Sequence, residues 1–308
     1  MLLQLDIREE ALAAIHDRRA VVALESTVIS HGLPFPGNLE TAHLMEAAIR
    51  RSGAVPATIG LLDGKIVVGL TDSEIERFAS EKGIFKVSRR DFAPVLTQKA
   101  TGATTVAATM LVCAAAGIRF FATGGIGGVH RGATLSFDIS ADLTELSQSP
   151  VAVVCAGPKA VLDIALTLEV LETLGVPVIG YKSNAMPAFY SRESGFALEY
   201  SYDTADALAA MLATHWRIGM KSGVLIANPP PADVALDRPD VESAIAEALT
   251  AAERLQIRGK AVTPFLLSHL TAATQGKTPS VNKALLVNNA SAAAEIAVAF
   301  QHVDYNAV

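Results

Sequence analysis

The segment Val151-Ala-Val-Val-Cys-Ala-Gly-Pro-Lys159 decides the fold, together with the helical pattern after it and Val176-Pro-Val-Ile-Gly180. It begins with an apolar run that ends at glycine, which is typical of a strand buried on both faces. Proline is tolerated in the first turn of a helix, so we expect a helix from Pro158 to Leu174. Strand, helix and strand then form a βαβ unit with parallel strands.

The same alternation continues through most of the chain. Strands are predicted at 20–24, 57–62, 65–70, 84–87, 118–123, 151–156, 176–180 and 223–227. Helices are predicted at 38–51, 71–83, 104–116, 158–174, 241–255, 264–273 and 281–299. No repeat, linker or low-complexity tract divides residues 1–308, which predicts a single domain. The expected fold is an α/β/α sandwich with a mainly parallel central sheet.

Two local signals add detail to this pattern. Asp63-Gly64 separates two apolar runs, which predicts a small antiparallel hairpin beside the parallel strands. Thr71-Asp-Ser-Glu74 has the spacing of a capping box and should open the next helix.

Composition excludes several classes of protein. A net charge of -6 argues against a surface for nucleic acid or another polyanion. The uncharged stretch from Ala100 to Ile118 is rich in Ala, Thr and Gly, which favours a buried helix over a membrane span. The acidic N-terminal residues do not resemble a signal peptide, so we expect a cytoplasmic protein. Cys113 and Cys155 lie in apolar runs and should be buried, reduced thiols.

Lys159 is the strongest candidate for a catalytic residue. It follows the buried strand directly, and the predicted helix would present its positive end to the amine. Desolvation and the dipole both disfavour the charged ammonium, which leaves an amine able to attack carbon. The alternative is that the side chain extends to solvent and has no chemical role.

Two further candidates lie at predicted strand ends. Glu25 ends the first strand, where partial burial would suit it to acid catalysis; the alternative is a structural acid bonded to nearby amides or His31. Lys86 stands near the end of another strand, in Lys86-Val-Ser-Arg-Arg-Asp91, and can neutralise an anion in a pocket. A plain surface run of charges is the other interpretation of that segment.

The loop Thr123-Gly-Gly-Ile-Gly-Gly-Val-His-Arg-Gly132 is dense in glycine. It has neither the dinucleotide-binding nor the P-loop spacing. Backbone N–H groups near His130 and Arg131 can still contact a phosphate or a sugar. The alternative is a tight crossover that needs glycine for positive φ.

Asp138 and Asp142 are four residues apart in Phe137-Asp-Ile-Ser-Ala-Asp-Leu143. On one helical turn both carboxylates would face the same way and offer oxygen ligands to Mg²⁺ or Mn²⁺. A helix cap is the alternative role for these residues. Asn289 lies in an apolar helical pattern and must either fasten a loop or reach a ligand.

Taken together, the chain resembles the pseudouridine-5'-phosphate glycosidases from about residue 15 to residue 300. The matching stretches are Ala23-Leu-Glu-Ser-Thr-Val-Ile-Ser-His-Gly32, Lys86-Val-Ser-Arg-Arg-Asp91, Gly102-Ala-Thr-Thr-Val106, Phe121-Ala-Thr-Gly-Gly-Ile-Gly-Gly-Val-His-Arg-Gly132, Phe137-Asp-Ile-Ser-Ala-Asp-Leu143, Val154-Cys-Ala-Gly-Pro-Lys159 and Thr263-Pro-Phe-Leu-Leu267. The resemblance implies reversible cleavage of the C–C glycosidic bond of pseudouridine 5'-phosphate to uracil and ribose 5-phosphate, through a lysine–ribose imine.

The resemblance also implies roles for individual residues. Glu25 would be the proton donor, Lys159 the nucleophile, and Asp138 a ligand of one Mn²⁺ per subunit, with Mg²⁺ as an alternative ion. The residues that would contact substrate or line the pocket are Lys86, Val106, Thr123, His130, Arg131, Ser140, Ala141, Asp142 and Asn289. The family further suggests a homotrimer.

Two rival functions use the same residues. A Schiff-base lyase or aldolase acting on another sugar phosphate would also need the lysine and an anion site. A non-enzymatic sensor of sugar phosphates or nucleotides would use Lys159 only to pair with phosphate.

Overall fold

The computed structural model describes residues 4–257 and 262–303. In this part of the chain, eleven strands form one sheet, whose main path runs β1-β4-β3-β2-β7-β9-β13-β11-β12, with β6 on β3 and β5 on β6. The strand bounds are β1 Leu5–Ile7, β2 Val21–Glu25, β3 Val55–Leu62, β4 Lys65–Val68, β5 Phe85–Val87, β6 Gly102–Thr104, β7 Phe120–Ala122, β9 Ala152–Cys155, β11 Val178–Tyr181, β12 Tyr200–Tyr202 and β13 Val224–Ala227. A separate antiparallel pair joins β8 (Val129–His130) to β10 (Leu162–Asp163).

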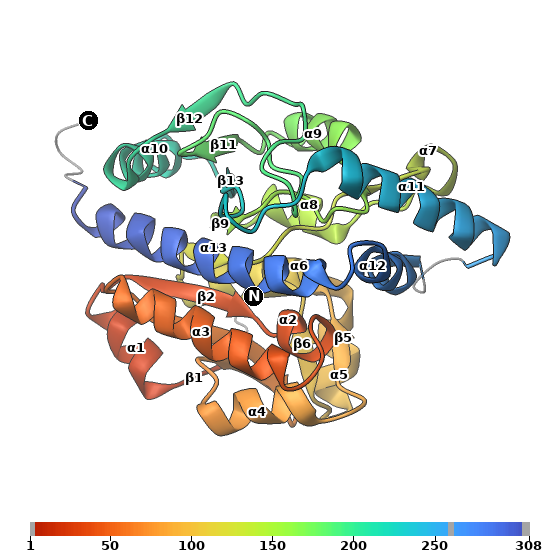
Figure 1. Ribbon diagram of the computed structural model, residues 1–308. Helices are drawn as coiled ribbons and strands as arrows, with labels where there is room; N and C mark the ends of the chain where they lie inside the picture. The colour runs from red at the N-terminus through yellow and green to blue at the C-terminus, as the bar shows by residue number, and fades with distance from the viewer. Residues whose placement is uncertain (1–3, 258–261, 304–308) are drawn as a thin grey trace.

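Helices cover both faces of the sheet. Their bounds are α1 Glu9–His16, α2 Thr27–His31, α3 Gly37–Arg51, α4 Asp72–Ser80, α5 Phe92–Thr97, α6 Val106–Ala116, α7 Ala133–Ser136, α8 Ala141–Leu146, α9 Ile164–Thr173, α10 Ala205–Arg217, α11 Arg238–Arg254, α12 Val262–Ala273 and α13 Lys277–Gln301. Figure 1 shows α13 crossing the middle of the molecule between α3 and α10, and α13 is in contact with both of these helices.

The strands alternate between two hydrophobic cores, as a sheet buried on both faces requires. Along β2, Val22 and Leu24 pack in the core under α3 and α13. Val21 and Ala23 pack in the opposite core, under α1 and α6. Every residue of β2 is buried. At about 25 cal/mol per Å² of apolar surface, this double burial is the main force that holds the helices on the sheet.

The predicted α/β sandwich with a mainly parallel sheet is confirmed. Along the main path from β3 to β12, each pair of adjacent strands is parallel. The hairpin is also confirmed, since β3 pairs antiparallel with β4 across Asp63-Gly64. Both cysteines are free and buried, as predicted. Within the described residues, no helix has the length and apolar character needed to cross a bilayer.

One predicted boundary is wrong, and it matters for the site. The helix expected at Pro158 begins at Ile164, after a loop and the short strand β10. The side chain of Asp163 caps this helix by accepting a hydrogen bond from the N–H of Leu166 at 3.0 Å. Proline fits the first turn of a helix but does not require one. Several further elements, most of them short, were not predicted from the sequence: β1, β6, β8, β10, β12, α1, α2, α5, α7, α8 and α10.

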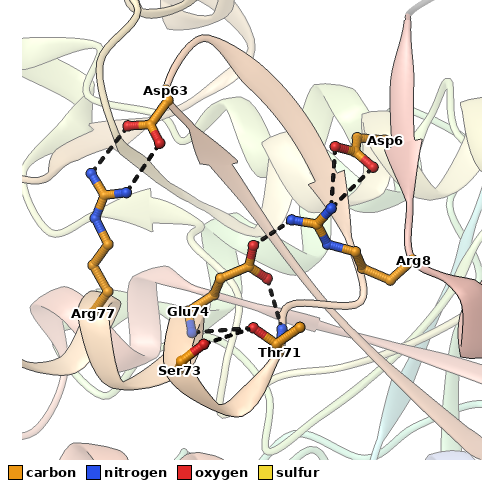
Figure 2. Close-up of polar contacts among 7 residues, drawn as sticks. All are labelled: Asp6, Arg8, Asp63, Thr71, Ser73, Glu74 and Arg77. Atoms are coloured by element: carbon orange, nitrogen blue, oxygen red, sulfur yellow. Dashed lines mark hydrogen bonds and ion pairs between the residues drawn. The ribbon is translucent and has the colours of Figure 1, made fainter.

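The capping box at the start of α4 is confirmed and carries further contacts. The N–H of Thr71 donates to Glu74 Oε2 at 2.8 Å, and Thr71 Oγ1 accepts from the N–H of Glu74 at 3.4 Å. Figure 2 shows that Arg8 reaches the same carboxylate, while Arg77 holds Asp63 in the hairpin turn. These contacts fasten the hairpin and the first strand to α4.

Replacing Thr71 with Ala removes the side-chain half of this cap. We expect a loss of about 1 kcal/mol in the free energy of unfolding, because one N–H at the helix start loses its acceptor. Urea denaturation with an unchanged m-value measures it. Ser80→Ala, in the last turn of the same helix, is the control and should change stability by less than about 0.5 kcal/mol. Equal effects of the two substitutions would contradict the role of the cap.

Candidate active site

Three neighbouring strands bring the main candidates together. Strand β7 pairs with β2 on one side and with β9 on the other. Glu25 is the last residue of β2, Thr123 follows β7, and Lys159 lies in the loop after β9. Ligands of open α/β sheets bind at the carboxyl ends of the strands. The fold therefore gathers these residues at the edge of the sheet where chemistry is expected.

Glu25 is a buried acid, with 5% of its surface exposed. Thr123 Oγ1 donates a hydrogen bond to Glu25 Oε1. Burial raises the pKa of Glu25 above its ordinary value, with the negative charge of Asp142 acting in the same direction. The positive charge of Lys159, the hydrogen bond from Thr123 and the charge of Lys86 oppose that shift. A carboxyl group in this setting can hold a proton for catalysis.

Lys159 lies in a loop whose backbone is fixed on both sides. Its N–H donates to the carbonyl of Ile126 at 3.0 Å, and its own carbonyl accepts from Leu162 at 2.9 Å. Gly157, with φ +85°, makes the turn that leads into it. Because α9 begins only at Ile164, the predicted action of that helix dipole on the amine does not apply. Lys159 is itself half-buried.

Lys86 lies in β5, opposite Ala103 of β6. The residue is exposed, yet desolvation by the protein around it is the first cause that lowers its pKa, followed by repulsion from Lys159. Glu25 and Asp142 raise that pKa. The two lysines and two carboxylates therefore lie close enough to act on one another, and Lys86 belongs to the cluster rather than to a plain surface run.

Asp142 fastens two segments of the backbone. Its Oδ1 accepts from the N–H of Ala107 at 2.9 Å and its Oδ2 from that of Gly127 at 2.7 Å. It is 6% exposed. A Cβ on Gly127 would lie 2.2 Å from Ser140 Oγ, so glycine is needed there for close approach. Gly127 does not have a positive φ, whereas Gly132 at the end of the same loop has φ +82°, so the crossover interpretation holds at that end alone.

The predicted pairing of Asp138 with Asp142 on one helical turn is wrong. Helix α8 begins at Ala141, and Ser140 caps it by accepting from the N–H of Asp142 at 3.2 Å. Asp138 precedes the helix, is exposed, and has an oxygen 3.9 Å from Nδ1 of His130. In the parts of the chain that the structure covers, no three His, Cys, Asp or Glu residues form a metal-binding group.

The remaining predicted residues lie on α6, on α8 and in the glycine-rich loop. Val106 is the buried first residue of α6, and Ala141 is the exposed first residue of α8. His130 lies in β8 and is half-buried. Arg131 forms an ion pair with Glu242 of α11 at 3.0 Å, which ties the glycine-rich loop to that helix.

Asn289 is fully buried in α13 and bonds to groups on two other segments of the chain. Its Nδ2 donates to the carbonyl of Thr123 at 2.8 Å. Its Oδ1 accepts from Asn228 Nδ2 at 2.9 Å. The contacts fit the first of the two predicted roles, the fastening of a loop.

Two residues near the site were not singled out from the sequence. Asn228 directly follows the apolar run of β13, so the rule that selected Glu25 would also have found it. His31 ends α2; burial lowers its pKa, and repulsion from Lys86 adds to this. Both the burial of His31 and its approach to Lys86 arise from the tertiary structure, and no sequence spacing signals them.

Two surface hollows lie away from this cluster. One, of about 540 Å³, is lined by Tyr181, Lys182 and Glu295 among others, and these three are bonded to one another. The other, of about 530 Å³, lies over α3 and α13. Neither is lined by Glu25, Lys86 or Lys159. The charged cluster is a better candidate, because it combines a proton-holding acid with two amines.

Known proteins resemble this chain over nearly its whole length. A family model described as "Indigoidine synthase A like protein" matches residues 10–299. The pseudouridine-5'-phosphate glycosidase of Caldanaerobacter subterraneus subsp. tengcongensis is 53% identical over 294 residues, which cover 96% of each chain. The enzyme of the same name from Brachyspira hyodysenteriae is 50% identical over 299 residues, 97% of each chain.

Two solved structures share the fold. The prealnumycin C-glycosynthase AlnA, in complex with ribulose 5-phosphate, has a TM-score of 0.91 and 43% identity over 96% of this chain and 97% of its own. An indigoidine synthase A-like protein of Thermotoga maritima has a TM-score of 0.88 and 33% identity over 98% of each chain. At these levels of identity over nearly the full length, the chain belongs to the pseudouridine-5'-phosphate glycosidase family.

Proposed function

We propose that this enzyme cleaves the C–C glycosidic bond of pseudouridine 5'-phosphate reversibly to uracil and ribose 5-phosphate. The names of its relatives support that substrate, and the complex of AlnA with ribulose 5-phosphate supports a sugar phosphate. One observation carries the chemistry. The buried acid Glu25, whose pKa burial raises, has the cation Lys159 as its strongest charged neighbour.

The chemistry differs from that of ordinary glycosidases, which protonate a leaving oxygen. A C-nucleoside has no such atom between sugar and base. In our proposal Glu25 protonates the ring oxygen O4', and the C1'–O4' bond breaks with its electron pair going to that oxygen. The amine of Lys159 then adds at C1' and loses a proton. The C1'–C5 bond then breaks: its electron pair goes to uracil, which takes a proton at C5, while the nitrogen lone pair forms the imine. Water hydrolyses the imine and restores the amine.

The other residues hold the substrate or the loops around it. We assign Lys86 to an anionic group of the substrate, because it lies close to both catalytic residues. The charge of Lys86 lowers the pKa of Glu25, and the charge of Lys159 lowers the pKa of Lys86. The backbone at Val106 and the Ser140-Ala141-Asp142 turn border the same space, since Asp142 joins the start of α6 to the glycine-rich loop. Thr123, His130, Arg131 and Asn289 belong to that loop or fasten it.

Asp138 is the residue that could hold a divalent ion, Mn²⁺ with Mg²⁺ as the alternative. Asp138 is an exposed carboxylate on the loop before α8, and hard cations of this kind keep several waters when bound by one or two carboxylates and a substrate phosphate. We propose one ion per subunit at Asp138. When bound, it would neutralise negative charge on the substrate.

We also propose a homotrimer in the cytoplasm. Leu135 in α7 and Phe137 directly after it are 91% and 82% exposed. Neighbouring exposed apolar side chains of this kind often mark an interface with another protein chain. An interface between subunits would cover them. Buried, unpaired thiols at Cys113 and Cys155 suit a reducing compartment.

Incubation with pseudouridine 5'-phosphate should release free uracil. Borohydride added with ribose 5-phosphate should leave a covalent mass gain on the wild-type enzyme, because it reduces an imine to a stable amine. Mass spectrometry locates the modified residue. Lys159→Ala should lose the gain, while Lys86→Ala should retain it even if substrate binds more weakly.

The outcomes separate the rival functions. A mass gain without uracil release indicates a lyase or aldolase on another sugar phosphate. Binding of ribose 5-phosphate with neither signal indicates a sensor. A gain that remains in Lys159→Ala and disappears in Lys86→Ala would make Lys86 the nucleophile and contradict our assignment.

Glu25→Gln should lower kcat about 100-fold or more with little change in KM, since the residue supplies a proton rather than a binding contact.

The same substitution, Glu25→Gln, should also raise stability at neutral pH. Burial raises the pKa of Glu25 in the folded state. The contribution of Glu25 to the free energy of unfolding is therefore fully present below its ordinary pKa of 4.5 and is lost as pH rises through the raised pKa. Denaturation at several pH values from about 5 to about 8 should show a flatter dependence in the variant.

Glu46→Gln is the matched control for Glu25→Gln. Glu46 is also buried, accepts a hydrogen bond from a threonine, Thr58, and has a pKa raised first by burial. Its substitution should flatten the pH dependence of stability in the same way but leave kcat unchanged. Full turnover in Glu25→Gln would remove Glu25 from the mechanism.

Removal of divalent ions with EDTA should lower the rate of uracil release, and added Mn²⁺ should restore it. Asp138→Asn should raise the Mn²⁺ concentration needed for half of the full rate, because it removes the proposed ligand. Asp206→Asn, at an exposed carboxylate in the first turn of α10, is the control and should behave as wild type. Full activity after EDTA treatment would contradict the metal site.

A further inference from the structure

We propose that the hydrogen-bonded chain Asn228–Asn289–Thr123–Glu25 positions the acid, with Thr123 holding one carboxylate oxygen so that the other, Oε2, exchanges the proton with substrate. The proposal rests on the function assigned to Glu25 above and adds three positioning residues to it. None of the three needs to touch the substrate.

Thr123 has every polar group committed. Its hydroxyl has a single proton, which it donates to Glu25 Oε1. Its N–H donates to the carbonyl of Val154 at 3.1 Å, and its carbonyl accepts from Asn289 Nδ2 at 2.8 Å. It is 1% exposed. The residue is therefore held between β7, β9 and α13, and its hydroxyl cannot turn away without losing a buried bond.

The two oxygens of Glu25 are consequently different. Oε1 accepts from Thr123, whereas no donor among the described residues bonds to Oε2. Glu25 as a whole keeps 5% of its surface exposed. An acid that gives up its proton and later takes it back needs one such oxygen facing the substrate, in a fixed direction.

The orientation of both asparagines follows from the groups around them. Asn289 faces the carbonyls of Thr123 and Gly124, two acceptors, so its NH₂ group must point at them. Its oxygen then needs a donor, and Asn228 Nδ2 supplies one at 2.9 Å. Because Asn228 follows β13 and Asn289 lies in α13, the chain of bonds passes over β9, which separates β13 from β7.

The hydroxyl of Thr123 also limits how far the pKa of Glu25 rises. Burial raises the pKa of Glu25, and the hydrogen bond from Thr123 lowers it by stabilising the charged form. In a reversible reaction the group must both donate and accept a proton. A donor on Oε1 keeps the carboxylate state accessible without blocking Oε2.

Thr123→Val removes the hydroxyl and keeps the branched shape. We expect kcat for uracil release to fall about tenfold with KM nearly unchanged, and the alkaline limb of the pH profile of kcat to move to higher pH. Thr123→Ser should restore both. Thr58→Val is the matched control: it removes the bond from a buried threonine to Glu46 and should leave kcat and the pH profile as in wild type.

Asn228→Asp tests the far end of the chain and serves if Thr123→Val does not fold. The carboxylate has the same shape but cannot donate to Asn289 Oδ1. It should move the alkaline limb in the same direction as Thr123→Val. The double variant should have the same kcat and pH profile as Thr123→Val alone, because both substitutions act through one bond to Glu25.

The results distinguish the failure of this proposal from failure of the function. If wild type releases uracil and Glu25→Gln does not, the function stands. An unmoved alkaline limb in Thr123→Val, an equal shift in Thr58→Val, or fully additive effects of Thr123→Val and Asn228→Asp would then overturn the positioning chain alone. Absence of uracil release by wild type would overturn the function itself.

Discussion

The pairing of β7 with β2 and β9 is the constraint on which the site depends. Strand β7 is short, but it is the shared neighbour of the strands that end in Glu25 and lead to Lys159. Parallel strands in register end at the same edge of a sheet, so their last residues meet without any contact between the loops. The alternating apolar residues of β2 and its neighbours bury both faces and hold that register.

Buried polar residues then fix the loops at this edge. Asp142 binds the backbone of Ala107 and Gly127, and Asn289 binds the carbonyl of Thr123. A buried polar group left without a partner lowers the stability of the fold by about 1–3 kcal/mol. Each of these contacts therefore favours the one loop conformation in which it can form. The glycines contribute by allowing side chains such as Ser140 to approach the backbone closely. The loop is thus shaped from outside by residues of α8 and α13.

The electrostatics of the site are a balance between burial and charge. Burial alone would keep Glu25 protonated, while Lys159, Thr123 and Lys86 favour its carboxylate. Burial and mutual repulsion also favour the neutral form of Lys86. A cluster with opposing influences on its protonation states can both give up and take back a proton, which acid and base catalysis require. The same burial makes Glu25 unfavourable for stability, a common cost at functional sites.

The sequence by itself determined the alternation of strands and helices, the hairpin, the capping box at Thr71, and the candidates at strand ends, because these depend on residue types at short spacings. It also placed Glu25, Lys86 and Lys159 at strand ends or in short strands. It did not predict that Asp138 and Asp142 have unlike surroundings, since a spacing of four residues aligns side chains only within a helix. Nor did it predict that α9 begins at Ile164 rather than at Pro158.

Only the tertiary structure decided which polar residues meet. Thr123, Asn289 and Asn228 are far apart in the sequence from Glu25 and from one another, yet they form one series of bonds. The order of the strands in the sheet and the docking of α13 across them create those contacts. The physical reason is that hydrogen bonds and desolvation act over a few ångströms in space, whereas a sequence pattern reports only neighbours along the chain.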